Sequence, residues 1–194
     1  MTLINEDFHL GMTLFPQIQG LFMKIPIINE VEFNQIDASR QLIATEYSRQ
    51  FAIIDLGENL GVYGISWNSD LIKPMVKLSP DGQTIWVGVE QKVAAICRET
   101  GKILLTLPLT SYLVQMLTLD KVTAVITEED FLLFNRRGSI RSNKSLPDTA
   151  IGMSLVEGDL VIKLLSGECL TINPETGSFQ KAGFIGNGIS LGLA

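Results

Sequence analysis

One pattern of short apolar runs and turns recurs four times along the chain, at intervals of nearly forty residues. In each copy an apolar run is followed by a polar loop, a second apolar run and a turn that ends in glycine. The glycines that close these turns are Gly61, Gly101, Gly138 and Gly177, at separations of 40, 37 and 39 residues. A period near forty that is filled by short strands predicts a repeat architecture with one small sheet in each unit.

The second copy, residues 76–101, shows the unit most clearly. Pro80 presets φ and Gly82 accepts a positive φ, so the two residues predict a tight turn. The β-branched and aromatic run 84–89 then predicts a strand, and a polar pair separates it from a second strand at 93–96.

The copies are expected at residues 29–63, 74–107, 113–144 and 150–182, within a single domain that covers residues 1–194. In the first copy, strands are expected at 31–33, 42–44 and 51–55. Residues 1–28 are irregular, and Pro26 restricts the apolar run 21–28 to an edge strand because proline has no N–H to donate. No copy contains an apolar pattern of helical period over ten residues or more.

The strands are apolar with little alternation, which indicates sheets that are covered on both faces. Stacking such sheets face to face around an axis covers both faces of each one. The expected fold class is therefore all-β, a small or partial β-propeller of four to five short antiparallel blades. The runs 21–28 and 184–193 are the candidates for a fifth blade. The alternative is an open propeller with an exposed strand edge.

Two stretches carry a resemblance to known proteins. Residues 78–89, LSPDGQTIWVGV, resemble the first turn and second strand of WD-repeat and quinoprotein-like β-propellers. Residues 99–102, ETGK, and 174–178, PETGS, resemble the turn between the third and fourth strands of the same families. The Trp-Asp dipeptide that names the WD repeats is absent, so the resemblance is to the superfamily rather than to one family within it.

The composition restricts the classes of partner. Only 19% of the 194 residues are charged and 46% are hydrophobic, which suits a folded core rather than a disordered chain. The net charge of −6 argues against a nucleic-acid surface and favours a basic protein partner, although an acidic surface also serves solubility alone. No apolar run approaches the roughly 20 residues of a membrane span, and the N-terminus lacks the pattern of a signal peptide, so a cytoplasmic location is expected.

Residues that carry chemistry are sparse, and no catalytic, cofactor-binding or metal-binding set is predicted. His9 is the single histidine, and a lone histidine forms neither a zinc site nor an oriented general base. The Gly-Asn-Gly motif at 186–188 is typical of a turn. Cys97 and Cys169 lie in apolar runs and are expected to be reduced, buried thiols. The chain is therefore expected not to be an enzyme.

The resemblance to propellers implies that the loops between second and third strands share one face with the loops between blades. Aromatic residues among charges are typical of protein-binding hot spots. The residues predicted to bind a partner on this face are Glu46, Trp67, Asp70, Glu90, Tyr112, Glu128, Glu129, Asp130 and Glu168. In the alternative interpretation these carboxylates are simply solvated and Trp67 packs inward. The opposite face is expected to carry Lys102, Arg136, Arg137 and Arg141.

The function predicted from these features is that of a non-catalytic protein-binding module. By analogy of charge, an immunity or inhibitor protein of a bacterial cytoplasm would neutralise a basic toxin or nuclease through such an acidic face. One alternative is a scaffold subunit whose propeller is completed by another chain. The other is an enzyme or small-ligand binder with a site at the propeller axis.

Overall fold

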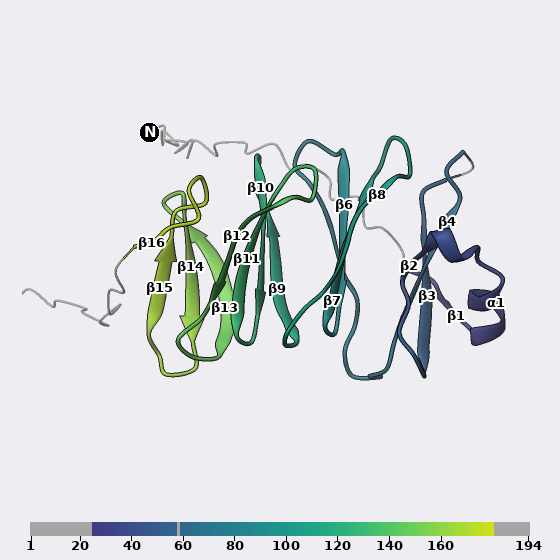
Figure 1. Ribbon diagram of the computed structural model, residues 1–194, viewed down its shortest axis with the longest axis horizontal. Coiled ribbons are helices and arrows are strands. Elements are labelled where there is room, and N and C mark those ends of the chain that lie inside the picture. The colour runs from purple at the N-terminus through teal and green to yellow at the C-terminus, as the bar shows by residue number, and fades with distance from the viewer. Residues whose placement is uncertain (1–24, 58, 181–194) are drawn as a thin grey trace, which may run out of the picture.

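The computed structural model describes residues 25–57 and 59–180 of the chain. The strands in these ranges form four sheets of four strands each. The sheets stand face to face in one row, with the first sheet at one end and the fourth at the other (Figure 1). The described residues therefore form an open, partial β-propeller, and the predicted all-β class is confirmed.

The second, third and fourth sheets share one design, in which each strand pairs antiparallel with the strand that follows it. The second sheet contains β5 (Met75–Leu78), β6 (Thr84–Val89), β7 (Lys92–Cys97) and β8 (Ile103–Pro108). The third contains β9 (Leu113–Thr118), β10 (Val122–Thr127), β11 (Asp130–Asn135) and β12 (Ile140–Ser145). The fourth contains β13 (Ala150–Val156), β14 (Asp159–Leu164), β15 (Cys169–Ile172) and β16 (Phe179–Gln180). Short turns between consecutive strands permit only this antiparallel arrangement.

The first sheet departs from this strand order. Its strands, in spatial order, are β1 (Ile27–Ile28), β3 (Gln50–Asp55), β4 (Val62–Trp67) and β2 (Gln41–Ile43). β2 runs parallel to β4 and does not pair with β3. β1 pairs with β3 instead and is an edge strand, in agreement with the restriction that Pro26 imposes.

The prediction of a strand at residues 31–33 is wrong, because these residues lie in the helix α1 (Glu30–Asn34). The Asn29 side chain accepts the backbone N–H of Glu32 at 2.9 Å, and the Glu32 carboxylate accepts the backbone N–H of Asn29 at 2.9 Å. This reciprocal capping box satisfies two N–H groups that a helix start leaves open, and it outweighs the β-leaning residues that follow. A 3-10 turn, η1 (Ala38–Arg40), then leads into β2.

The helix α1 covers the outer face of the first sheet. Phe33 is the buried residue of the helix, and its ring centroid lies 5.3 Å from that of Phe51 on β3. The neighbouring residues Ala52 and Ile54 belong to the core shared with the second sheet. Because side chains alternate along a strand, Phe51 and Phe33 must lie on the opposite side of the sheet.

Three apolar clusters fill the spaces between neighbouring sheets. The first joins the first and second sheets around Ile65 and Ile96, and the second joins the second and third sheets around Trp86. The third joins the third and fourth sheets around Leu133 and Ile162. Every residue of β6 and of β10 is buried, which explains why these strands show no polar alternation in the sequence.

A hydrogen bond at the boundary between the first and second sheets accounts for one of the recurring glycines. The Tyr63 hydroxyl on β4 donates to the carbonyl oxygen of Gly101 at 2.5 Å. Gly101 has a φ of +66°, and a Cβ atom at this position would lie 2.5 Å from the Tyr63 hydroxyl oxygen. Both the backbone conformation and the close approach therefore require glycine here.

The third and fourth sheets are joined along their inner strands. The Gln115 side chain on β9 donates to the carbonyl oxygen of Met153 on β13 at 2.8 Å and accepts the N–H of the same residue at 2.7 Å. One amide group thus satisfies both backbone groups of a residue in the next sheet, which fixes the position of β13 relative to β9.

Replacement of Trp86 by alanine should lower the free energy of unfolding by about 3–5 kcal/mol. The Trp86 side chain is fully buried, and its ring centroid lies 5.1 Å from that of Phe134 on β11. Its indole N–H has no hydrogen-bond partner among the described residues. Trp86→Phe is the control and should cost less than about 1.5 kcal/mol, since it keeps most of the ring and removes an unsatisfied donor. Urea unfolding measures both, and equal losses would contradict this account of the core.

Candidate protein-binding surface

Two kinds of loop meet along one side of the row of sheets, where one set of strand ends lies. They are the turns between the second and third strands of a sheet and the connections from one sheet to the next. The Glu90 carboxylate, in the β6–β7 turn, accepts the backbone N–H groups of Asn68 and Ser69 at 3.0 and 2.6 Å. Lys92 donates to the Thr45 hydroxyl at 3.2 Å, which places the loop before β3 on this side as well.

The same arrangement continues through the third and fourth sheets. The Glu128 N–H, in the β10–β11 turn, donates to the Tyr112 carbonyl at 3.0 Å, and the Glu128 carbonyl accepts from Ala150 at 2.9 Å. In the β14–β15 turn, the Leu165 N–H donates to the Thr149 carbonyl at 2.8 Å. We call this continuous surface the loop end; it consists of residues 44–49, 68–74, 90–91, 109–112, 128–130, 146–149 and 165–168.

Carboxylates outnumber cations on the loop end. Its acidic residues are Glu46, Asp70, Glu90, Glu128, Glu129, Asp130, Asp148 and Glu168, and its basic residues are Arg49 and Lys73, with Lys92 directly beside it. Charges that lie on one surface add into one field, so the loop end carries a negative potential.

Asp148 is an acidic residue of this surface that the sequence-based prediction missed. Its carboxylate accepts the backbone N–H groups of Thr149 and Ser166 at 2.8 Å each. These hydrogen bonds, that of Thr149 foremost, lower the pKa of Asp148 below its usual value because they stabilise the charged form. The repeat offered a signal for it, since Asp148 lies in a connection between sheets, as Asp70 does.

Trp67 was predicted to bind a partner, but the structure places it in the core with 3% of its surface exposed. It is the last residue of β4, faces the second sheet and donates its indole N–H to the Ile72 carbonyl at 2.8 Å. The ring is therefore covered by its own chain, and the alternative interpretation, in which it packs inward, is correct.

Two of the predicted carboxylates hold the loops together rather than face solvent freely. Glu90 bridges two backbone N–H groups of the neighbouring connection, as described above. Asp130 accepts hydrogen bonds from the hydroxyls of Thr110 and Ser145, the latter at 3.0 Å. Both carboxylates are half-buried, so their role is to fix the shape of the surface.

The other predicted residues are exposed on the loop end. These are Glu46, Asp70, Tyr112, Glu128, Glu129 and Glu168. Large apolar side chains that were not predicted stand among them, with exposed fractions of 93% for Tyr47, 88% for Leu71 and 68% for Leu165. Apolar residues normally indicate the core, so their exposure could not be read from the sequence pattern alone.

The opposite side of the row carries the predicted cations, and acidic groups accompany them. The Arg136 guanidinium lies 3.5 Å from the Asp81 carboxylate. Arg141 donates to the backbone carbonyl of Glu175 at 2.5 Å, and the Glu175 carboxylate pairs with Lys121 at 3.2 Å. The loop end and the opposite side of the row therefore differ in charge: the loop end is acidic, and the opposite side carries charges of both signs.

Within residues 25–57 and 59–180, no group of three or more His, Cys, Asp or Glu side chains could hold a metal ion. No helix in the same ranges is long and apolar enough to span a membrane. His9, the motif at 186–188 and the run 184–193 lie outside the described residues.

No protein-family model matches the chain, and no curated protein matches its sequence. Among solved structures, the chain is similar to the Pan2 WD40 domain of Neurospora crassa, with 13% identity and a TM-score of 0.49 over 56% of this chain and 37% of that one. It is also similar to hydrazine synthase of Kuenenia stuttgartiensis, with 12% identity and a TM-score of 0.47 over 59% of this chain and 36% of that one. Sqt1 of Saccharomyces cerevisiae is similar as well, with 16% identity and a TM-score of 0.47 over 55% of this chain and 34% of that one. The chain spans roughly a third of the length of these three chains.

The two cysteines should differ in reactivity. Both are free thiols, but Cys169 is buried, as predicted, whereas Cys97 is half-buried, so that part of the prediction is wrong. The Thr100 hydroxyl, followed by its backbone N–H, lowers the pKa of the Cys97 thiol by stabilising the thiolate. A thiol reagent should therefore label Cys97 quickly in the native protein and Cys169 only after unfolding.

The pH profile of labelling tests the cause. Because a lowered pKa populates the thiolate at lower pH, Cys97 labelling should rise at a lower pH than that of an ordinary cysteine thiol. Thr100→Ala should move the rise to higher pH. An unchanged profile would show that Thr100 does not stabilise the thiolate.

Proposed function

We propose that the protein is a non-catalytic binding module that recognises a basic protein surface through its loop end. The observation that carries the proposal is the excess of carboxylates on one surface whose loops are hydrogen-bonded to each other. A surface held in this way needs little ordering when it binds, which lowers the entropic cost of association.

Apolar side chains at the loop end supply the other part of an interface. Tyr47 and Leu71 are exposed on loops that also carry Glu46 and Asp70, and Tyr112 is exposed on a connection that is hydrogen-bonded to Glu128. Exposed aromatic residues are the usual anchors of protein–protein interfaces, while carboxylates around them speed the encounter with a basic partner and select against acidic ones. The expected partner therefore has a basic surface with apolar hollows.

The narrower prediction of an immunity protein that neutralises a basic toxin or nuclease stays a prediction. Its support is the same acidic surface, because the substrate-binding surface of a nuclease is basic. Retention of a nuclease by the loop end, with loss of nuclease activity, would support it.

The open row of sheets supports a second candidate, a subunit whose propeller is completed by another chain. Among the described residues no sheet packs on the outer face of the fourth sheet, where Val156 is 49% exposed. A partner that docks there would be insensitive to charge reversal at the loop end and sensitive to Val156→Lys.

Reversal of two exposed carboxylates, Glu128→Lys with Glu129→Lys, should slow association with the partner and weaken its retention. These residues make no side-chain contact that holds the fold, so the free energy of unfolding should change by less than about 0.5 kcal/mol each. Proteins retained from a cell lysate on the immobilised protein, compared at low and high salt, provide the measurement. Retention should fall with salt, because the Debye length is only about 8 Å at physiological ionic strength.

The matched control is Glu99→Lys with Glu157→Lys, which makes the same change in charge on the side of the row opposite the loop end. It should leave retention unchanged. If the control loses the retained proteins and the loop-end variant keeps them, the binding surface is not the loop end.

A further inference from the structure

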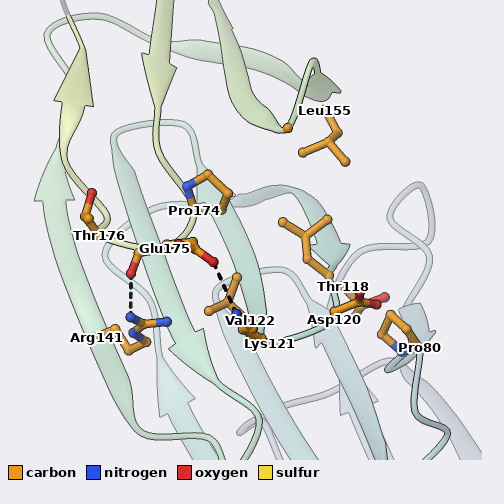
Figure 2. A pocket seen from close by; sticks show the side chains of 12 residues that line it. Pro80, Thr118, Asp120, Lys121, Val122, Arg141, Leu155, Pro174, Glu175 and Thr176 are labelled. Carbon is orange, nitrogen blue, oxygen red and sulfur yellow. Dashed lines mark hydrogen bonds and ion pairs between the residues drawn. The ribbon is translucent and has the colours of Figure 1, made fainter.

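A cavity of about 790 Å³ opens on the side of the row opposite the loop end. Three sheets contribute to it through their turns: Pro80 from the second, residues 118–122 from the third, and Gly158 with residues 174–176 from the fourth (Figure 2). Pockets of roughly 300–1,000 Å³ are the usual size for small molecules. The proposed function at the loop end makes no use of this cavity.

One part of the cavity wall is apolar. It contains Leu119, Val122, Leu155 and Pro174. Leu155 lies directly opposite the fully buried Leu160 on the neighbouring strand, yet half of its own surface is exposed. An apolar group bound in the cavity would remove this surface from water, which is the main source of affinity for small apolar ligands.

Charged groups of both signs stand on the rim. Lys121 pairs with the Glu175 carboxylate at 3.2 Å, and Arg141 uses one N–H to reach the Glu175 backbone carbonyl. The Asp120 carboxylate is exposed on the other side of the cavity, next to Pro80 (Figure 2). Lys121 and Glu175 are both 73% exposed, and an ion pair of this kind contributes little, so a ligand can open it at small cost.

We propose that this cavity binds a small zwitterion with an apolar body, of the chemical class of a short apolar peptide with both termini free. The peptide carboxylate is bound by Arg141 and Lys121, and its ammonium group by Asp120 or by the Glu175 carboxylate that Lys121 releases. The apolar side chains lie against Leu155 and Val122.

The balance of charge on the rim favours a ligand that carries both signs. A purely anionic ligand would bring its charge close to Asp120 and Glu175, and a purely cationic one would approach Lys121 and Arg141. Like charges placed side by side repel, whereas a zwitterion brings a group of opposite sign to the cations and to a carboxylate of the rim. The guanidinium of Arg141 has five N–H donors in a planar fork, a shape that suits a carboxylate.

Titration of the ¹⁵N-labelled full-length protein with dileucine, followed by two-dimensional NMR, tests the proposal. Dileucine should produce saturable shifts in the backbone amides of Lys121, Leu155, Gly158 and Thr176. N-acetyl-dileucine and dileucine amide each lack one terminal charge and should bind about threefold more weakly. Diglycine keeps both charges but lacks the apolar body, and it should bind at least about tenfold more weakly.

Variants with matched controls locate the site. Leu155→Ser and Lys121→Ala should each weaken dileucine binding, by about tenfold and threefold respectively. Leu165→Ser and Lys73→Ala make the same changes at exposed positions of the loop end and should have no effect. All four side chains are exposed, so the variants should fold.

Three results would overturn the proposal. They are the absence of saturable shifts at the four pocket amides up to the solubility limit of dileucine, equal binding of the blocked and free peptides, and equal loss of affinity in the control variants. Because the loop-end variants serve here only as controls, failure of this proposal leaves the proposed function at the loop end untouched.

Discussion

The packing of one sheet face against the next is the interaction on which the rest of this structure depends. A sheet of four short strands cannot bury an apolar face on its own, and here each space between sheets is filled by side chains from both neighbours. The two middle sheets are covered on both faces, so β6 and β10 contain only buried residues. Both proposed binding surfaces follow from this arrangement, because stacked sheets leave their turns exposed along two opposite sides of the row.

The recurring turns made most of this architecture predictable from the sequence. Gly101, Gly138 and Gly177 all adopt positive φ at equivalent turns, and each lies against side chains of the preceding sheet. Glycine is required by both conditions, so its spacing reports the repeat directly. The runs rich in β-branched residues then indicate the strands, because a strand covered on both faces is apolar at successive residues and not only at alternate ones.

The predictions that failed are those that depended on tertiary context. Residues 31–33 contain two β-leaning side chains, but the reciprocal cap between Asn29 and Glu32 sets the local structure. The parallel pairing of β2 with β4 leaves no trace in a strand of three residues. For Trp67, a position at the very end of a strand is compatible with burial or exposure, and the contact with the second sheet decides it. The exposed Tyr47, Leu71 and Leu165 were missed for the converse reason, since apolar residues normally indicate the core.

The helix α1 has a consequence for how such molecules associate with each other. A sheet at the end of a stack presents a flat apolar face onto which a second molecule can add, and repeat proteins avoid this with terminal units that have a polar outer surface. Here Phe33 occupies that face, while the exposed Glu30 and Glu32 point charge toward solvent. A molecule approaching this end would have to displace Phe33 and bring its own sheet against two carboxylates. The helix, although it has only five residues, therefore disfavours end-to-end aggregation at the first sheet.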